Sequence, residues 1–335
     1  MRRLNHWPGV RRVMGYVRNW PYRRRMVTLR EQIQAAPLSP ALHMELGRLY
    51  MAIGRPISSA GCLRTSLGLG GTDTAVYPLL ARAYAQANCA SLARQVTAVY
   101  QLPESLLDGA LAADDGLYRL FPPIYQRLRL VADIIQARQV ETAVRVLDVG
   151  GGEGALSLFL PEADYVLAEP TVNGLFGQQQ FLGEQQFDVV VACHVLEHIP
   201  EPEKPQFLSD LASLTRRTLI LLGPVADVQP GVEVTALTYS ITGAPWAKEH
   251  LECHTPWLAD IEAFAQAQGW QFEAEPNSHR TAVYWMVFAD HYARLAGKRA
   301  ELQRLFSFAN QQLNQTISSV EQPNDYLVVL TRPDS

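Results

Sequence analysis

The sequence has few cysteines and no long uninterrupted apolar run. Its four cysteines are scattered without a C-x-x-C pair, so we expect reduced thiols in the cytoplasm rather than a disulfide framework. No apolar run approaches the roughly 18 residues that a membrane-spanning helix needs. No apolar segment of the signal-peptide type follows the first arginines, which argues against secretion. These absences predict a soluble, cytoplasmic protein.

Acidic side chains are missing from residues 1–30, which hold nine arginines interleaved with bulky aromatics. We interpret this segment as a basic N-terminal arm that is either disordered or in weak contact with an anionic surface. An organellar transit peptide would also be basic, but the aromatics and the scarcity of serine do not fit one. We expect no specific nucleic-acid partner.

A short pattern recurs in the first third of the chain. Residues 46–54 read LGRLYMAIG and residues 80–88 read LARAYAQAN, an offset of 34 residues. That is the period of tetratricopeptide helix pairs, in which small residues such as Gly47 and Ala81 let helices approach closely. Residues 31–107 therefore resemble tetratricopeptide-like helical repeats, and residues 108–139 read as connector helices. The repeats could bind a protein partner or support the neighbouring domain, and the sequence leaves both open.

Residues 144–155, VRVLDVGGGEGA, form the most informative motif. A short apolar strand ends at Asp148, four glycines follow, and residues 155–160 read as the start of a helix. Glycines allow a tight turn with a ligand lying against the backbone, and a helix start offers unpaired N–H groups. The motif predicts a nucleotide-type cofactor site. It also satisfies a dinucleotide fingerprint, so a nicotinamide cofactor stays open at this point.

Two more segments narrow the choice. Residues 165–170 form a second apolar strand that ends in Glu169, and residues 187–200 read FDVVVACHVLEHIP. With the glycine motif, they resemble the class I S-adenosylmethionine-dependent methyltransferases of type 11 and type 23 over residues 140–335. The resemblance implies an α/β fold: a Rossmann-like, doubly wound, mostly parallel sheet of the seven-stranded type, here preceded by an all-α helical-repeat domain. We expect strands near residues 144–149, 165–168, 189–192, 218–222, 271–274 and 327–330.

The resemblance also implies the cofactor, S-adenosyl-L-methionine, and the residues around it. Glu169 would accept hydrogen bonds from both ribose hydroxyls, and the other candidates are Asp148, Gly150, Gly151, Gly152, Gly154, Cys193 and His194. Residues 170–186 leave little room for the usual helix and third strand, and their only acid is Glu184. We therefore expect adenine to be recognised by backbone groups or glutamines.

Histidines are the candidates for the catalytic step, because a hydroxyl acceptor must lose its proton. His254 and His198 are the two that we single out. His250 and His254 are four residues apart and would share a helical face near Cys253, but a metal site needs three or four ligands in the right geometry, so we expect none. Residues 276–323 are long for a hairpin and could form a lid or a docking surface, and we expect their apolar part, residues 283–289, to belong to the core.

The sequence thus predicts methyl transfer from S-adenosylmethionine, with O-methylation of a small-molecule or glycan-type acceptor as the favoured reaction. A second hypothesis is a non-catalytic adaptor, with helical repeats and a degenerate methyltransferase-fold domain. A nicotinamide-linked oxidoreductase is a more distant third.

Overall fold

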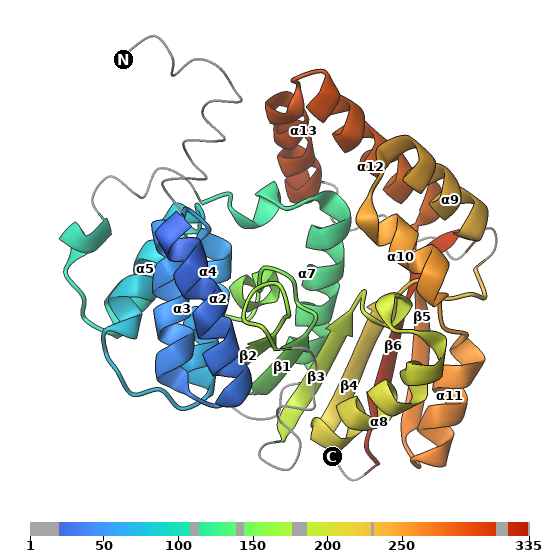
Figure 1. Cartoon of the computed structure of the whole chain (residues 1–335), viewed down its shortest axis with the longest axis horizontal. Helices are drawn as coiled ribbons and strands as arrows, with labels where there is room; N and C mark the ends of the chain where they lie inside the picture. The colour runs from blue at the N-terminus through green and yellow to red at the C-terminus, as the bar shows by residue number, and fades with distance from the viewer. Residues whose placement is uncertain are drawn as a thin grey trace.

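The computed structural model describes residues 20–107, 114–138, 144–175, 186–228, 231–312 and 321–333. Its helices and strands follow one another in a helical part, a sheet part and a late helical insertion before the last strand (Figure 1). In chain order, with η for 3₁₀ helices, they are α2 (Trp20–Ala35), α3 (Pro40–Ala52), α4 (Pro56–Gly68), α5 (Val76–Gln86), α6 (Ala90–Val99), η1 (Glu104–Leu107), η2 (Leu117–Arg119), α7 (Pro122–Ala137), β1 (Arg145–Val149), η3 (Ala155–Leu158), β2 (Asp164–Ala168), β3 (Phe187–Cys193), η5 (Leu196–His198), η6 (Glu201–Glu203), α8 (Lys204–Leu214), β4 (Thr215–Gly223), α9 (Gly231–Thr242), α10 (Pro245–Cys253), α11 (Leu258–Ala267), β5 (Gln271–His279), α12 (Arg280–Leu295), α13 (Arg299–Gln312) and β6 (Pro323–Thr331).

Among the described residues, the sheet has six strands in the order β2-β1-β3-β4-β6-β5. The first four run parallel, and β6 pairs antiparallel with both β4 and β5. This confirms the α/β, mostly parallel fold and all six expected strands. A seventh strand is not among the described residues. Of residues 170–186, which leave little room for the usual helix and third strand, residues 176–185 lie outside the described residues, together with Glu184.

The strands form where the sequence is continuously apolar. Every residue of β3 is buried, as is typical of parallel strands covered on both faces. Because parallel strands end at one edge of the sheet, the segments after β1, β2 and β3 come together there. Around that edge Figure 1 places the N-terminal helices on one side and α9, α10, α12 and α13 on the other.

The first part of the chain is helical, as expected. Leu46 and Leu80 are buried, as are Tyr50 and Tyr84, at equivalent positions of α3 and α5. A Cβ on Gly47 would lie 2.8 Å from Leu63 Cγ, so the small residue does permit a close approach of α3 and α4.

The expected boundary of the basic arm at residue 30 needs correction. Helix α2 begins at Trp20, and Met26 and Leu29 within it are buried. Residues 20–30 therefore belong to the packed helical part, because their apolar side chains recur at helical spacing. The remainder of the arm, residues 1–19, lies outside the described residues.

Helix α4 covers the outer edge of β2, the strand that ends the sheet order. Thr65 Oγ1 accepts a hydrogen bond from the backbone N–H of Leu167 at 3.0 Å. The Asn173 side chain donates to the Leu167 carbonyl at 2.6 Å and accepts from the Glu169 N–H at 3.0 Å. Side chains thus satisfy backbone groups that a further strand would otherwise pair.

The apolar segment 283–289 is not core, contrary to expectation. It lies in α12, where no residue is buried and the Trp285 side chain is 70% exposed. The reason is its place in the insertion between β5 and β6, where α12 packs beside α9 and α13 as well as the sheet. A groove of about 350 Å³ runs there, lined by Leu237, Ile241, Trp285, Phe288, Ala289 and Tyr292.

No helix of the described residues is long and apolar enough to cross a membrane. The four cysteines are all free, and Cys62, Cys89 and Cys193 are buried.

Candidate cofactor and acceptor site

The glycine turn, residues 150–154, leaves β1 in a conformation that glycine adopts readily. Gly150, Gly152 and Gly154 have φ of 68°, 57° and 81°, in the left-handed region. A Cβ on Gly151 would lie 2.1 Å from the Asp148 carboxylate, whereas one on Gly152 would meet no atom within 4 Å. The turn is therefore closed on the side of Asp148 and open at Gly152, where a ligand has room against the backbone.

The prediction of a longer helical run over residues 155–160 is wrong. The segment forms only the four-residue 3₁₀ helix η3, and all of its side chains are buried. Helix α4 packs against η3, and a Cβ on Gly154 would lie 3.0 Å from the Gly61 Cα of α4. So short a helix has no macrodipole of note, and the helix-terminus contribution that the sequence suggested does not apply.

Asp148 lies buried beneath the turn, consistent with a role in ordering it. The Tyr165 hydroxyl donates to Asp148 Oδ2 at 2.6 Å, while Oδ1 has no partner among the described residues. Burial raises the pKa of Asp148 to about 7, against the lowering effect of the Tyr165 hydrogen bond and with a smaller raising effect from Glu169. The carboxyl group therefore changes its protonation near neutral pH.

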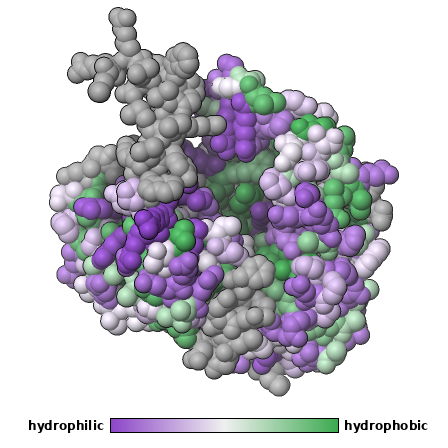
Figure 2. All heavy atoms as spheres, in the orientation of Figure 1, coloured by the Kyte–Doolittle hydropathy of each residue, from purple (hydrophilic) through white to green (hydrophobic). Residues whose placement is uncertain are grey.

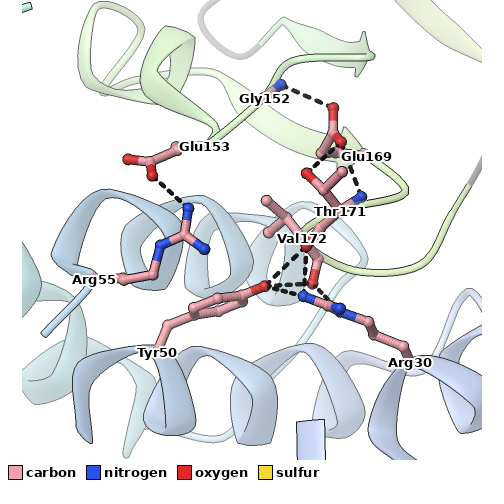
Figure 3. Close-up of polar contacts among 8 residues, drawn as sticks. All are labelled: Arg30, Tyr50, Arg55, Gly152, Glu153, Glu169, Thr171 and Val172. Carbon is pink, nitrogen blue, oxygen red and sulfur yellow. Dashed lines mark hydrogen bonds and ion pairs between the residues drawn. The ribbon is translucent and has the colours of Figure 1, made fainter. Parts of the chain in front are cut away.

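Glu169 ends β2 and faces the turn, as expected, but its carboxylate is already engaged (Figure 3). The Gly152 N–H donates to Oε2 at 3.1 Å, and the Thr171 N–H and hydroxyl donate to Oε1 at 2.9 and 2.7 Å. A carboxylate offers about four acceptor positions, so about one stays open. In this conformation Glu169 has room for one ribose hydroxyl rather than two.

Helices of the N-terminal part hold the Glu169 loop, residues 169–175, from outside. Arg30 of α2 donates to the Thr171 carbonyl and, at 3.0 Å, to the Val172 carbonyl, which also accepts from the Tyr50 hydroxyl at 2.7 Å. Figure 3 shows these two side chains reaching from neighbouring helices to the same stretch of backbone. Sequence reasoning missed them, because neither residue type nor spacing signals a contact with so distant a segment.

A second contact joins the helical part to the turn itself. Arg55, which precedes α4, forms an ion pair with Glu153 in the glycine turn (Figure 3). Both side chains are more than two-fifths exposed, so the pair contributes about 0–1 kcal/mol. The ion pair places the start of α4 beside the glycine turn.

The segment after β3 carries Cys193 and His194 to the same edge of the sheet. Burial raises the pKa of the Cys193 thiol to about 12, so it stays protonated. His194 has a φ of 57°, and its Nδ1 lies 2.9 Å from Glu197 Oε1. Burial and Arg127 lower the pKa of His194, but the carboxylates of Asp325 and Glu197 outweigh them and raise it.

Two further histidines meet beside Glu197. The Nε2 atoms of His198 and His250 are 3.3 Å apart, and His250 Nε2 lies 3.8 Å from Glu197 Oε1. Burial lowers the pKa of His250 to about 4. Burial alone would raise the pKa of the Glu197 carboxyl, but the imidazoles of His194, His250 and His198 bring it to about 2. We call Glu197, His198 and His250 the histidine cluster.

His254 does not join this cluster, and it does not share a helical face with His250. Helix α10 ends at Cys253, and His254 follows with a φ of 58° and an exposed side chain. Lys204 Nζ bonds the carbonyls of Cys253 and His254 at 2.7 and 2.9 Å and so fixes this helix end. Their four-residue spacing predicted one continuous helix, but the positive φ of His254 takes the chain out of it.

A family of methyltransferase domains matches residues 114–303, more than half of the chain. The match includes the glycine turn, Glu169 and the histidine cluster. The chain belongs to this family. It is an S-adenosylmethionine-dependent methyltransferase, as the sequence predicted, and its cofactor is S-adenosylmethionine. A search of curated proteins found no match.

Several solved structures are similar to this methyltransferase in fold. The magnesium protoporphyrin IX methyltransferase of Synechocystis PCC 6803 with bound SAH is 16% identical, with 63% of this chain and 84% of that chain covered and a TM-score of 0.40. A SAM-dependent methyltransferase of Archaeoglobus fulgidus is 14% identical, with 61% and 94% covered and a TM-score of 0.39. The plantazolicin methyltransferase in complex with a pentazolic desmethylPZN analog and SAH is 12% identical, with 76% of this chain and 96% of that chain covered and a TM-score of 0.39. These values are too low to carry an acceptor over to this chain.

The methyltransferase is hollowed where its strands end. Figure 2 shows a recess on this face, between the N-terminal helices and the helices of the late insertion. Val195, between His194 and the histidine cluster, contacts the glycine turn so closely that a Cβ on Gly150 would lie 2.5 Å from its Cγ2. The turn and the residues after β3 therefore form one continuous site.

Proposed function

We propose that this methyltransferase transfers a methyl group to a hydroxyl oxygen of a small-molecule or glycan-type acceptor. The histidine cluster is the observation that carries the proposal. It sets two imidazole nitrogens and a carboxylate oxygen within 4.8 Å of one another, and its Glu197 lies two residues after Val195, which contacts the glycine turn. A hydroxyl is a poor nucleophile until its proton is withdrawn, and groups of this kind act on such protons.

The cofactor residues fit S-adenosylmethionine with one adjustment. The open side of Gly152 leaves room for a ligand, the Asp148 Oδ1 atom beneath the turn is unpartnered among the described residues, and Glu169 has about one free acceptor position. We propose that Glu169 binds one ribose hydroxyl and that the turn, Cys193 and His194 border the rest of the cofactor. When bound, the cofactor supplies an electrophilic methyl group on a sulfonium.

This chain's part in the reaction is alignment and handling of the acceptor proton. The sheet edge and the Glu169 loop would fix the cofactor, while the residues after β3 would fix the acceptor oxygen opposite the methyl group. Of the two catalytic candidates, the geometry favours His198, whose Nε2 faces His250. His254 remains a prediction without support from its position.

Calorimetry with S-adenosylhomocysteine tests the cofactor assignment. We expect Glu169→Gln to weaken binding about tenfold, because one charge-assisted hydrogen bond is worth about 1.5–3 kcal/mol. Glu162→Gln, at an exposed position just before the same strand, is the matched control and should bind like wild type. Equal affinity of all three proteins would contradict the role of Glu169.

The reaction class needs a separate experiment. Cell extract incubated with the enzyme and a cofactor carrying an isotope-labelled methyl group should yield a labelled product, and mass spectrometry with NMR would locate the label. A label on oxygen supports the proposal. A label on nitrogen or carbon would overturn it while leaving the methyltransferase assignment intact.

We also infer that α3 to α6 are tetratricopeptide-like repeats, with the sheet domain starting near residue 140 and connector helices between them. The equivalent buried pairs in α3 and α5 support this inference.

A protein partner could use the outer surface of these helices, where Tyr77 stacks on Tyr100 at 3.5 Å and Val99 is 64% exposed. Contact of the basic residues 1–30 with an anionic surface is testable by co-sedimentation with anionic vesicles.

A further inference from the structure

The ligand atoms of the histidine cluster converge as they do around a metal ion. His198 Nε2 and His250 Nε2 are 3.3 Å apart, His250 Nε2 and Glu197 Oε1 are 3.8 Å apart, and the three atoms lie within 4.8 Å of one another. Tetrahedral zinc at about 2.1 Å from each ligand would hold those ligands about 3.4 Å apart. A small contraction of the cluster would therefore bring all three atoms to bonding distance.

The groups behind the cluster are those that orient metal ligands. His198 Nδ1 lies 2.7 Å from Glu249 Oε2, so its Nε2 is the atom that faces the cluster. A carboxylate on the far nitrogen of a ligating histidine fixes the ring and makes it a better donor. Trp246 packs edge-on against the His250 ring, with the ring centroids 5.2 Å apart. These contacts restrict how far either imidazole can turn away.

Glu197 is anchored from below. His194 Nδ1 lies 2.9 Å from its Oε1, and His194 Nε2 is 3.5 Å from Asp325 Oδ2 of β6. The Glu197 side chain is 1% exposed, while those of His250 and His198 are 12% and 29% exposed. The cluster is therefore fixed at its base and reachable from solvent, as a site with an open coordination position requires.

We propose that Glu197, His198 and His250 bind a divalent transition-metal ion, with zinc fitting the two-nitrogen, one-oxygen donor set and the spacing best. The ion would be held by residues of two elements, η5 and α10. Ion binding stands on the geometry alone.

The ion's use in catalysis rests on the proposed O-methylation. A hydroxyl next to a divalent cation has a lowered pKa. Its proton would pass to solvent water, the oxygen electron pair would form the new O–CH₃ bond, and the C–S bond would break with its electrons going to sulfur. With the ion bound, His198 would act as a ligand and not as a free base, and the acceptor would become a nucleophile at neutral pH through the ion.

The test is Co²⁺ titration of the full chain after dialysis against a chelator, followed by visible absorption, with Zn²⁺ as a competitor. We expect one equivalent of Co²⁺ to give an absorption band that Zn²⁺ removes. His250→Ala should abolish the band, and Glu249→Gln, on an exposed side chain, should weaken Co²⁺ binding about 10–100-fold. Cys253→Ser is the matched control on α10 and should leave the band unchanged.

Three outcomes would overturn the proposal: no band in wild type, a band unchanged in both His250→Ala and Glu249→Gln, or a band lost in Cys253→Ser. Calorimetry with S-adenosylhomocysteine shows whether each variant is still folded, because the cofactor residues are untouched. Co²⁺ binding by an enzyme that labels nitrogen or carbon would reject the proposed function and keep the metal site. Labelled oxygen without Co²⁺ binding would do the reverse.

Discussion

Gly61 of α4 and Gly154 of the glycine turn pack backbone against backbone. A Cβ on Gly61 would lie 3.2 Å from both the Gly154 Cα and the Glu153 carbonyl oxygen, and one on Gly154 would lie 3.0 Å from the Gly61 Cα. The helical part of the chain thus touches the turn at which we place the cofactor. It is a structural component of that site and not a separate module.

Substitution of Gly61 should separate stability from cofactor affinity. In Gly61→Ala, the gain in helix propensity, about 1 kcal/mol, offsets the mild crowding, so we expect the free energy of unfolding to change little. Cofactor affinity should still fall, because the turn must shift. Gly61→Leu should lose about 1–3 kcal/mol of stability as well. Denaturant unfolding and calorimetry with S-adenosylhomocysteine measure the two effects, and an Ala variant with unchanged affinity would speak against the coupling.

Neighbouring glycines of the turn should respond differently to alanine. Gly151→Ala puts a Cβ against the buried Asp148 carboxylate, so we expect a loss of about 1–3 kcal/mol, smaller in the double variant with Asp148→Ala. Gly152→Ala meets no atom but has a φ of 57°, which costs about 1–2 kcal/mol. Its larger effect should be on the cofactor, because its Cβ would enter the open side of the turn. Thermal unfolding of the two variants, with and without S-adenosylhomocysteine, measures the loss of stability and the loss of cofactor binding in each.

Asp148 should give the protein a distinct pH dependence. Its pKa rises from 3.8 to about 7 on folding, so between these values the unfolded state loses a proton that the folded state keeps. Stability from this group is present below pH 3.8 and is lost as pH rises toward 7, by up to about 1.4 kcal/mol per pH unit. Tyr165 and Glu169, which face it, are unchanged in Asp148→Asn. Relative to that variant, wild type should lose stability between about pH 4 and pH 7, and parallel curves would refute the shift.

The hydrogen bonds from Arg30 and Tyr50 to the Glu169 loop should contribute more to stability and cofactor binding than an exposed ion pair on α2. Tyr50→Phe removes the hydroxyl that donates to the Val172 carbonyl, and we expect a loss of about 0.5–1.5 kcal/mol with weaker cofactor binding. Arg30→Ala should act in the same direction. Arg25→Ala, which breaks an exposed ion pair with Glu45, is the control and should change stability by about 0–1 kcal/mol without affecting the cofactor.

The elements that could be predicted from the sequence are those that depend on a run of consecutive residues. The apolar runs that end at Asp148, Glu169 and Cys193 became β1, β2 and β3, because strand burial depends mainly on local pattern. The helix after the turn was not predictable, since η3 is shaped by α4, a distant segment.

The histidine cluster shows the same limit. His198 and His250 are 52 residues apart, and no spacing rule pairs them. The spacing of His250 and His254 fits a helix, but α10 ends at Cys253 and His254 has a positive φ that takes it out of the helix. Only the packing of α10 on η5 identifies the right partner.

Helix α4 covers the edge of β2, and a fragment without the N-terminal helices would leave that edge exposed. A fragment starting near residue 140 would lose Thr65, and the Leu167 N–H would face solvent at the end of the sheet. Bare strand edges pair with those of other molecules, so such a fragment would be prone to intermolecular β-pairing and aggregation. The N-terminal helices thus cover an edge of the sheet as well as shaping the site.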